Sequence, residues 1–572
     1  MFPKYLSIII YLFLFFCFPS INSDVYDYEI ILSEDSYSFN GKQVNDTVIN
    51  ITRSNNYLFK GSSSKCSIVV ARQSFLYITL DSVTLENSER IPFLIERNST
   101  VFLTLKGVNK ITDENSYGAA VKVELGGSLK IDGDGTLVIL GNSKNGIEGE
   151  EGSRLQTSGG TYNITCVNDG ISFEDTMFLY DSIFNIKTSK GVGIKSDSRN
   201  PNPGYNGDIA IMGATFNINS YSDAILSSNN IDIGDSNFTI KTENGKGLSV
   251  TNTQEKDHIE IIIKTATFYL DTEDDAIYSS GDLTIQNGAF NIVTGKNGIH
   301  SIKRLTIGQY KNEIPTPQIN INKSLKGFEG SKIVIHSGIH NITASNSGIF
   351  SGGDSTNNKQ SLNYGNLNYR KINKRDLQST DESDIYISGG KIYINSEKNG
   401  IEAKGDISIS GGNLVLWGAK SGSEGDFVNL NGKMVISGGT LFGAGNVKQP
   451  DKWLLSQDKI NGANKVNEND YISIVRKNIT KKYYKAPKSV DYLYYTDPKV
   501  NSSFYNFSLT YTKPNITGDE DENNDEDRFY RFEEEDSDED DEDDFLPIHK
   551  KGENIKYNIV LLMMIIAFIL SV

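Results

Sequence analysis

Cysteine is nearly absent from the sequence. Of its three cysteines, Cys17 lies in a hydrophobic N-terminal stretch, and only Cys66 and Cys166 lie in the body of the chain. Two cysteines exclude a small scaffold held together by several disulfides. A Cys66–Cys166 bridge and two separately buried thiols both fit the sequence, because Cys166 continues the alternation of an apolar strand.

The chain also lacks a basic stripe of the kind found in nucleic-acid-binding proteins, so we do not expect nucleic acid as a partner. The formal net charge is −17, but residues 519–544 hold 18 acidic residues and two arginines, a net charge of −16. The rest of the chain therefore sums to −1. We expect a nearly neutral folded body followed by an acidic, disordered spacer at 516–556.

Each end of the sequence carries an apolar stretch. Residues 1–23 combine Lys4 with the apolar run 6–18, which is typical of a cleaved signal peptide. Residues 557–572 end without a polar tail, which predicts either a GPI-attachment signal or a C-terminal transmembrane anchor. We therefore expect a monomer displayed on the outer face of a cell. Secretion also predicts N-glycosylation of Asn-x-Ser/Thr sites, including Asn98, Asn163, Asn237, Asn341, Asn478, Asn501 and Asn506.

The chain does contain a repeat in which a small residue precedes an apolar one, as in "NGIE" at Gly146, "DGIS" at Gly170 and "DAIY" at Ala276. Two alternating segments follow it, such as "LTI" at 283–285 and "AFNIV" at 289–293. This period of two indicates β-strands, and the body shows no sustained helical periodicity. Long intervals hold loop insertions, the largest at 352–384.

Repeated strand–turn–strand units must stack on their neighbours to bury their apolar faces. Stacking places the apolar residue of each repeat, from Ile147 to Ile401, in one internal ladder and a series of phenylalanines in another. We predict an all-β fold, a single-stranded right-handed parallel β-helix with a small C-terminal β cap. The first coils and an N-terminal cap are expected at 24–116, the regular coils at 117–445 and the C-terminal cap at 446–515.

Several units resemble a known family. "NGIEGEEGSRLQTSGGTYNITCVNDGIS", "DDAIYSSGDLTIQNGAFNIVTGKNGIHS" and "NGIEAKGDISISGGNLVLWGA" are similar to repeats of bacterial cell-surface carbohydrate-binding proteins with a pectate-lyase-like β-helix. The resemblance runs from about residue 45 to residue 510. It implies a non-catalytic protein that binds acidic plant cell-wall polysaccharide such as polygalacturonate, or cellulose, and that carries Ca²⁺. The C-terminal hydrophobic segment, the acidic spacer and the insertion depart from the family pattern.

Acidic residues recur just before the small residue of the repeat. Asp and Asn at this position tolerate turn conformations and bond their own turn backbone, which is one interpretation. The other is a Ca²⁺ site, because Ca²⁺ takes about six to eight oxygen ligands and stacked turns place Asp223 and Asp275 on one edge, two coils apart. The candidate ligands are Asp169, Asp223, Glu273, Asp274 and Asp275, with Glu148, Glu329 and Glu402 as a weaker second set.

Catalytic signatures are limited to the Asp274–Asp275 pair, because the Gly-His-Gly and Arg-Ile-Lys motifs of polygalacturonase-like β-helices are missing. A Ca²⁺-dependent uronate lyase is an alternative function, with Lys195, Lys246, Lys296 or Arg304 as the base, and so is a structural, adhesin-like solenoid. We interpret His300 and His336 as isolated and His340 as a packed core residue. Sugar binding is expected to use outward aromatic rings and lysines, namely Tyr278, Trp417, Lys195, Lys246 and Lys296, with Tyr205 and Tyr393 as further outward rings.

Overall fold

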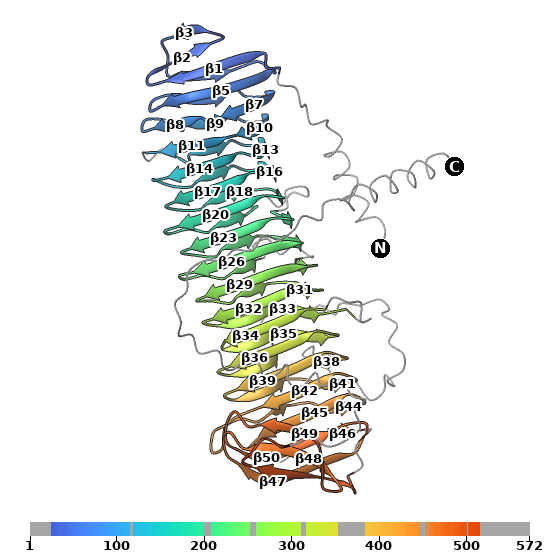
Figure 1. The fold of residues 1–572 in the computed structure, drawn as a ribbon. Helices are drawn as coiled ribbons and strands as arrows, with labels where there is room; N and C mark the ends of the chain where they lie inside the picture. Colours follow the sequence, from blue (N-terminus) through green and yellow to red (C-terminus); the bar gives the residue numbers. More distant parts are fainter. Residues whose placement is uncertain are drawn as a thin grey trace, which may run out of the picture. The chain divides into compact units, whose positions relative to one another are not determined.

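The computed structural model describes residues 25–114, 118–198, 207–251, 259–309, 316–352, 384–446, 453–455, 457–499 and 502–514. The predicted signal peptide, nearly all of the insertion, the acidic spacer and the C-terminal hydrophobic segment lie outside these residues. Within them every regular element is a β-strand. The strands form a parallel solenoid of about 14 coils, consistent with a right-handed β-helix, so the predicted fold is confirmed (Figure 1).

Most coils contribute three short strands, and equivalent strands of neighbouring coils pair in parallel. The first strand begins at or just before the apolar residue that follows the small residue. These first strands are β12 (Val121–Val123), β15 (Ile147–Gly149), β18 (Ile171–Phe173), β21 (Ile194–Ser196), β24 (Ile225–Ser227), β27 (Leu248–Val250), β30 (Ile277–Ser279), β33 (Asn297–Ile307), β35 (Lys326–Ile335), β37 (Ser347–Ser351), β40 (Asn399–Ala403) and β43 (Val428–Leu430).

The second strand of each coil corresponds to the first alternating segment of the repeat, and in β33 and β35 it is continuous with the first. The separate second strands are β13 (Ser128–Gly133), β16 (Arg154–Ser158), β19 (Met177–Tyr180), β22 (Ile209–Met212), β25 (Asn230–Gly234), β28 (Glu260–Ile263), β31 (Asp282–Ile285), β38 (Ile385–Ile387), β41 (Ile407–Ile409), β44 (Met434–Ile436) and β46 (Trp453–Leu455).

The third strands form a sheet of their own, and we call its outward side the third-strand face. Its members are β8 (Thr84–Asn87), β11 (Val108–Asp113), β14 (Thr136–Gly141), β17 (Thr161–Cys166), β20 (Ile183–Thr188), β23 (Thr215–Ser220), β26 (Ser236–Thr242), β29 (Ala266–Thr272), β32 (Ala289–Thr294), β34 (Gln318–Lys323), β36 (Ile339–Ala344), β39 (Lys391–Ser396), β42 (Asn413–Trp417) and β45 (Thr440–Gly445). The sequence predicted only two strands per coil, because many first strands have three residues and are too short to show alternation.

The core contains the two ladders that the repeats predict. Ile147, Ile171, Ile194 and Ile225 pair in register from coil to coil and are buried. The rings of Phe184, Phe216, Phe238, Phe268 and Phe290 stack in order, with centroid separations of 4.9, 4.9, 4.5 and 4.9 Å. Alternation explains both ladders, because it turns every second residue inward.

Glycine in the repeat is required by close packing between coils. A Cβ atom at Gly170 would lie 2.5 Å from the carbonyl oxygen of Gly193, and one at Gly193 would lie 2.6 Å from that of Ala224. Their backbone N–H groups donate to the carbonyls of Val192 and Asp223 in the following coil. The small residue therefore allows the turn of one coil to lie directly against the next.

Antiparallel strands complete both ends of the solenoid. At the N-terminal end β1 (Tyr28–Ser33), β2 (Ser36–Phe39) and β3 (Lys42–Val44) form a meander, and β1 pairs in parallel with β5. At the other end β50 (Val490–Thr496) pairs antiparallel with β45 and with β47 (Lys459–Val466). These strands satisfy sheet edges that would otherwise be open to other chains. The remaining early strands are β4 (Val48–Ile51), β5 (Asn56–Ser63), β6 (Ser67–Val70), β7 (Phe75–Asp81), β9 (Phe93–Ile95) and β10 (Thr100–Lys106).

A separate three-stranded sheet belongs to the C-terminal cap. It consists of β48 (Tyr471–Arg476) between β49 (Ile479–Lys485) and β51 (Tyr505–Thr510), all antiparallel. Its side chains form a second apolar cluster with the third-strand face of the last coils, where Trp417 and Phe442 are fully buried. Trp417 does face outward from its strand, but the cap covers it, so the prediction that it is open to bind sugar is wrong.

Cys66 and Cys166 are both buried and both free. Of the two sequence-based alternatives, separately buried thiols are confirmed and the bridge is wrong. Burial raises the pKa of the Cys166 thiol to about 12, so this side chain stays protonated and unreactive at neutral pH.

Candidate functional site

The acidic residues of the repeat turns bond the backbone of the next coil. The Oδ1 atoms of Asp169, Asp223 and Asp275 accept hydrogen bonds from the N–H groups of Val192, Lys246 and Asn297 at 2.9, 2.8 and 3.0 Å. The repeat pattern predicted that these side chains bond the backbone of their own turns. The structure shows that these side chains join successive coils instead, and Asp223 and Asp275 do lie on one edge, two coils apart.

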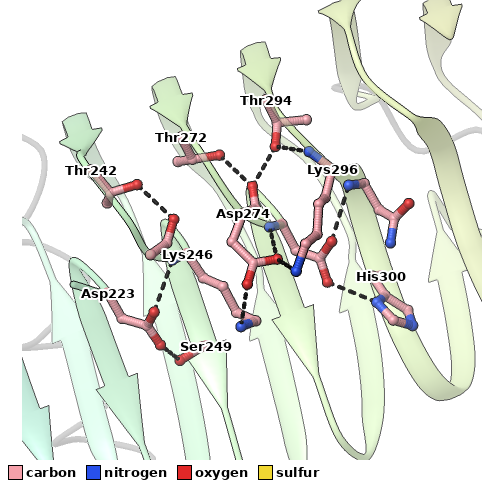
Figure 2. A network of polar contacts seen from close by, with 12 residues as sticks. Asp223, Thr242, Lys246, Ser249, Thr272, Asp274, Thr294, Lys296 and His300 are labelled. Carbon is pink, nitrogen blue, oxygen red and sulfur yellow. Dashed lines mark hydrogen bonds and ion pairs between the residues drawn. The ribbon is translucent and has the colours of Figure 1, made fainter. Parts of the chain in front are cut away.

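Asp274 lies between two lysines, as Figure 2 shows. One carboxylate oxygen is 3.0 Å from the Nζ atom of Lys246, and the other is 3.0 Å from that of Lys296. Partial burial acts to raise the pKa of Asp274, but hydrogen bonds from the two ammonium groups outweigh it and hold the pKa below its usual value. Asp274 is therefore ionised and neutralised by protein cations.

Asp275 is the adjacent carboxylate, and its second oxygen contacts a histidine. Its Oδ2 atom lies 2.8 Å from Nδ1 of His300, whose Nε2 atom lies 3.9 Å from Glu329. Glu329 in turn pairs with Lys326 at 2.6 Å. The interpretation of His300 as isolated is wrong, because pairing of β30, β33 and β35 places His300 beside these acids. His336 also has a partner, since its Nδ1 atom lies 2.8 Å from Ser388 Oγ.

These contacts do not fit the Ca²⁺ site expected from the sequence. Asp223 uses its second oxygen to accept a hydrogen bond from Ser249 Oγ at 2.5 Å, while Glu273 is exposed beside the Asp274 network. Across the described ranges, no three His, Cys, Asp or Glu side chains are grouped so that they could hold a metal ion. The ammonium groups of Lys246 and Lys296 lie where a cation would be expected beside Asp274.

The other predicted sugar-binding residues are also engaged with protein groups. Tyr278 is half-buried on β30, with Lys246 Nζ 5.3 Å from its ring centroid. Lys195 pairs with Asp197 at 3.3 Å. Lys296 keeps 58% of its side-chain surface exposed. Tyr393 is partly buried against the cap cluster, and Tyr205 lies outside the described residues.

The third-strand face carries an open groove that the sequence analysis did not identify. The groove has a volume of about 690 Å³ and crosses seven consecutive third strands, β17, β20, β23, β26, β29, β32 and β34. Its floor consists of outward side chains that pair in register from coil to coil. We call the series at one register position the amide row. Its members Asn163, Asn185, Asn217, Thr239, Tyr269 and Asn291 line the groove, and Asn320 and Asn341 continue the row beyond the groove.

Side-chain amides in this row bond one another between coils. Asn185 Nδ2 donates to Asn163 Oδ1 at 2.8 Å, and Asn217 Nδ2 donates to Asn185 Oδ1 at 2.8 Å. Farther along, Asn341 donates to Asn320 at 2.8 Å. A primary amide has two N–H donors and two acceptor lone pairs. Each bonded amide therefore keeps hydrogen-bonding capacity for a ligand in the groove.

An aromatic ring and charged side chains accompany the amides. Tyr269 lies within the row with 55% of its surface exposed, and it is one of the largest exposed apolar side chains of the described residues. Lys187, Lys241 and Asp271 line the same groove. Lys241 and Asp271 lie 3.1 Å apart but remain 63% and 59% exposed, so their ion pair is weak and can rearrange around a ligand.

One feature of the sequence could have indicated this groove, namely the asparagines at outward positions of successive strands. In "TFNIN" the alternation places Asn217 and Asn219 outward, and comparable asparagines occur in "TYNIT", "IFNIK" and "AFNIV". Taken one strand at a time, these residues look like ordinary solvent-exposed positions. Only the register between coils shows that they form a continuous row.

Three predicted glycosylation sites also lie on this face. Asn163 and Asn341 belong to the amide row, and Asn237 is exposed on β26. Asn98 and Asn478 have positive φ angles at turns, and Asn506 is exposed on β51, whereas Asn501 lies outside the described residues. Glycosylation at these asparagines stays a prediction.

Comparison with known proteins identifies the family. A family model described as "carbohydrate-binding domain-containing protein" matches residues 45–298 and 207–370, together more than half of the chain. The chain therefore belongs to the carbohydrate-binding domain-containing family, and carbohydrate is its general ligand class. The resemblance seen in the repeats is thereby confirmed.

One solved structure and two negative findings complete the comparison. A polysaccharide lyase-like protein from C. thermocellum, solved as a gadolinium derivative, aligns with 21% identity and a TM-score of 0.34. The alignment covers 40% of this chain and 97% of that one. No curated protein matches the chain. Among the residues that the structure describes, no helix is long and apolar enough to span a membrane.

Proposed function

We propose that the protein binds a linear, carboxylate-bearing polysaccharide such as polygalacturonate in the groove of the third-strand face, without cleaving it. The observation that carries the proposal is the amide row with Tyr269 at its centre. The amides offer hydrogen bonds to sugar hydroxyl groups, and the exposed tyrosine ring offers an apolar surface to a pyranose face. Membership of a carbohydrate-binding family supports the same ligand class.

The preference for an acidic polysaccharide is argued from Lys187 and Lys241. Both lysines are exposed and lie beside the amide row, at positions that pair with the outward residues of β23 and its neighbours. An ammonium group in this position attracts the carboxylate of a uronate and also bonds neutral hydroxyl groups. We therefore expect polygalacturonate to bind more tightly than cellulose, with a preference that weakens as salt concentration rises.

Calcium dependence, which the family resemblance implies, and display at the cell surface are two further proposals, separate from the groove contacts. The contacts of Asp223, Asp274 and Asp275 supply no calcium cage, so the proposed binding relies on the amides, Tyr269 and the lysines. Binding with and without EDTA tests the calcium dependence. Surface labelling of intact cells tests the proposed attachment through residues 557–572.

Affinity electrophoresis in gels with polygalacturonate, a neutral plant polysaccharide or neither is the direct experiment. We expect polygalacturonate to retard the protein and the Tyr269→Ala change to weaken retardation roughly five- to tenfold, because it removes the ring platform. Tyr511→Ala, which changes a tyrosine that is 86% exposed and lies outside the groove, is the matched control. Equal retardation of both variants would disprove binding at Tyr269. Release of an ultraviolet-absorbing unsaturated product would favour the uronate lyase instead.

A further inference from the structure

We infer that the bound polysaccharide runs along the axis of the solenoid, across the third strands, with one sugar residue over each coil. This inference rests on the proposed function and adds the direction, repeat and length of the binding track. The track is the amide row, which offers one outward side chain per coil at the same register position.

The direction follows from how the polar groups are arranged. The amide–amide hydrogen bonds of Asn163, Asn185 and Asn217 connect neighbouring coils, so equivalent donors and acceptors recur along the axis. Within one strand the outward residues can differ in chemistry, as Asn185 and Lys187 of β20 and Tyr269 and Asp271 of β29 do. Identical sugar units bind best to similar side chains at regular intervals. The amide row supplies such side chains along the solenoid axis, across the strands.

The spacing of the row suits a polysaccharide. Neighbouring strands in a sheet lie about 4.8 Å apart, which is close to the length that one pyranose adds to an extended 1,4-linked chain. Successive sugars can therefore meet successive coils without losing register. Tyr269 lies in the same row, with Thr239 before it and Asn291 after it, so one sugar of the chain stacks on its ring while its neighbours bond polar side chains.

Both ends of the track are defined. Towards the N-terminus the residue paired with Asn163 is Val138 on β14, which ends the polar series. Towards the C-terminus the residue paired with Asn341 is Tyr393 on β39, which packs against the cap cluster. Between these limits the row has one position on each of β17, β20, β23, β26, β29, β32, β34 and β36. The structure thus predicts a track for about eight sugars.

Titration calorimetry with oligogalacturonates of defined length tests this inference on the full chain. We expect the dissociation constant to fall with each added sugar up to seven or eight residues and then to level off. An affinity that stops improving at two or three sugars would overturn the track while leaving polysaccharide binding intact. Failure of every oligomer and of the polymer gel would overturn the proposed function itself.

A pair of variants gives a second test. Asn217 and Asn320 lie two coils before and two coils after Tyr269, and neither contributes to the core. If the ligand follows the axis, Asn217→Ala and Asn320→Ala each weaken heptasaccharide binding roughly three- to tenfold, through lost hydrogen bonds. A ligand lying along β29 would not reach either residue, so unchanged affinity in both variants would overturn the inference. Ser172→Ala, on the outward side of first strand β18, is the control, and circular dichroism confirms folding of all three.

Discussion

At the scale of single residues, His340 shows how burial in the core changes the protonation of a side chain. Its ring is fully buried beside Phe328 in a position that phenylalanine or isoleucine takes in other coils, as its sequence position predicted. Its Nε2 atom lies 3.1 Å from the carbonyl oxygen of Ser337, whereas Nδ1 has no hydrogen-bond partner. Burial lowers the pKa of His340 to about 4, so the imidazole is neutral at physiological pH.

Replacing His340 changes how stability depends on pH. The folded-state pKa lies below the unfolded value of about 6.5, so the unfolded chain binds a proton first and the protein loses stability as pH falls from 6.5 towards 4. In the His340→Leu variant, stability no longer falls with pH through this histidine, and the buried Nδ1 atom without a hydrogen-bond partner is gone. We expect the variant to be more stable than the wild type at pH 5 by about 1–3 kcal/mol, with a smaller difference at pH 8. Denaturant unfolding at both pH values measures this, and a difference independent of pH would contradict it.

The sequence was sufficient to identify Asp274 and Asp275 as candidate site residues, but not the side chains that contact them. Asp274 and Asp275 were recognisable as an unusual pair within the repeat, and Lys246 and Lys296 as basic residues nearby. Which side chain contacts which depends on the register between coils, which places Lys246 and Lys296 on either side of Asp274. A Ca²⁺ site and an ion-paired network require the same residue types, and only geometry distinguishes them.

At the scale of elements, the stacked phenylalanines of the third strands illustrate why the repeat is stable. Phe238 lies between Phe216 and Phe268, at centroid separations of 4.9 and 4.5 Å, and is almost completely buried. Truncating it leaves a cavity that the neighbouring coils cannot fill without shifting their own strands. We expect Phe238→Ala to lower the free energy of unfolding by about 3–5 kcal/mol.

Urea unfolding measures the change at Phe238, with a matched variant on the same strand. Thr239→Ala alters the outward neighbour of Phe238 and should change stability by less than about 0.5 kcal/mol. Phe238→Leu, which keeps most of the apolar volume, should lie between the two. Equal effects of Phe238→Ala and Thr239→Ala would show that the ring ladder contributes little.

The same alternation accounts for several of the predicted glycosylation sites. In a strand that reads Asn-x-Thr, both the asparagine and the threonine point outward and the middle residue points into the core. Asn163, Ile164 and Thr165 on β17 follow this rule, and so do Asn341, Ile342 and Thr343 on β36. An Asn-x-Thr glycosylation site therefore arises wherever a strand has an asparagine in the amide row and a threonine at its next outward position. At Asn163 and Asn341 the two roles exclude each other, because a glycan attached to the side-chain amide would occupy the track.

At the scale of the whole solenoid, the repeats predicted the fold because each unit carries the same inward pattern. A small C-terminal β cap was predicted, but its position against the third-strand face was not. Trp417 looked outward in the alternation of β42, and it does point to the outer side of that sheet. Residues 472–486 cover it there, and a contact between segments so far apart in sequence leaves no local signal.

This arrangement predicts that the cap separates before the coils unfold. The cap cluster around Trp417, Phe442 and Ile472 is distinct from the main core, and repeat proteins lose structure in units that contact only their neighbours. In a Trp453→Phe variant Trp417 is the single tryptophan of the chain, and its emission reports whether the cap is docked. We expect this emission to shift to longer wavelength at a lower urea concentration than the loss of β-sheet circular dichroism.

The reciprocal variant provides the control for cap separation. In Trp417→Phe the remaining tryptophan, Trp453, lies in the main core against Phe427 and Tyr494. We expect the emission of Trp453 to change at nearly the same urea concentration as the circular dichroism of the coils, unlike the emission of Trp417. Coincident transitions for both tryptophans and for circular dichroism would mean that the cap and the last coils unfold as one cooperative unit.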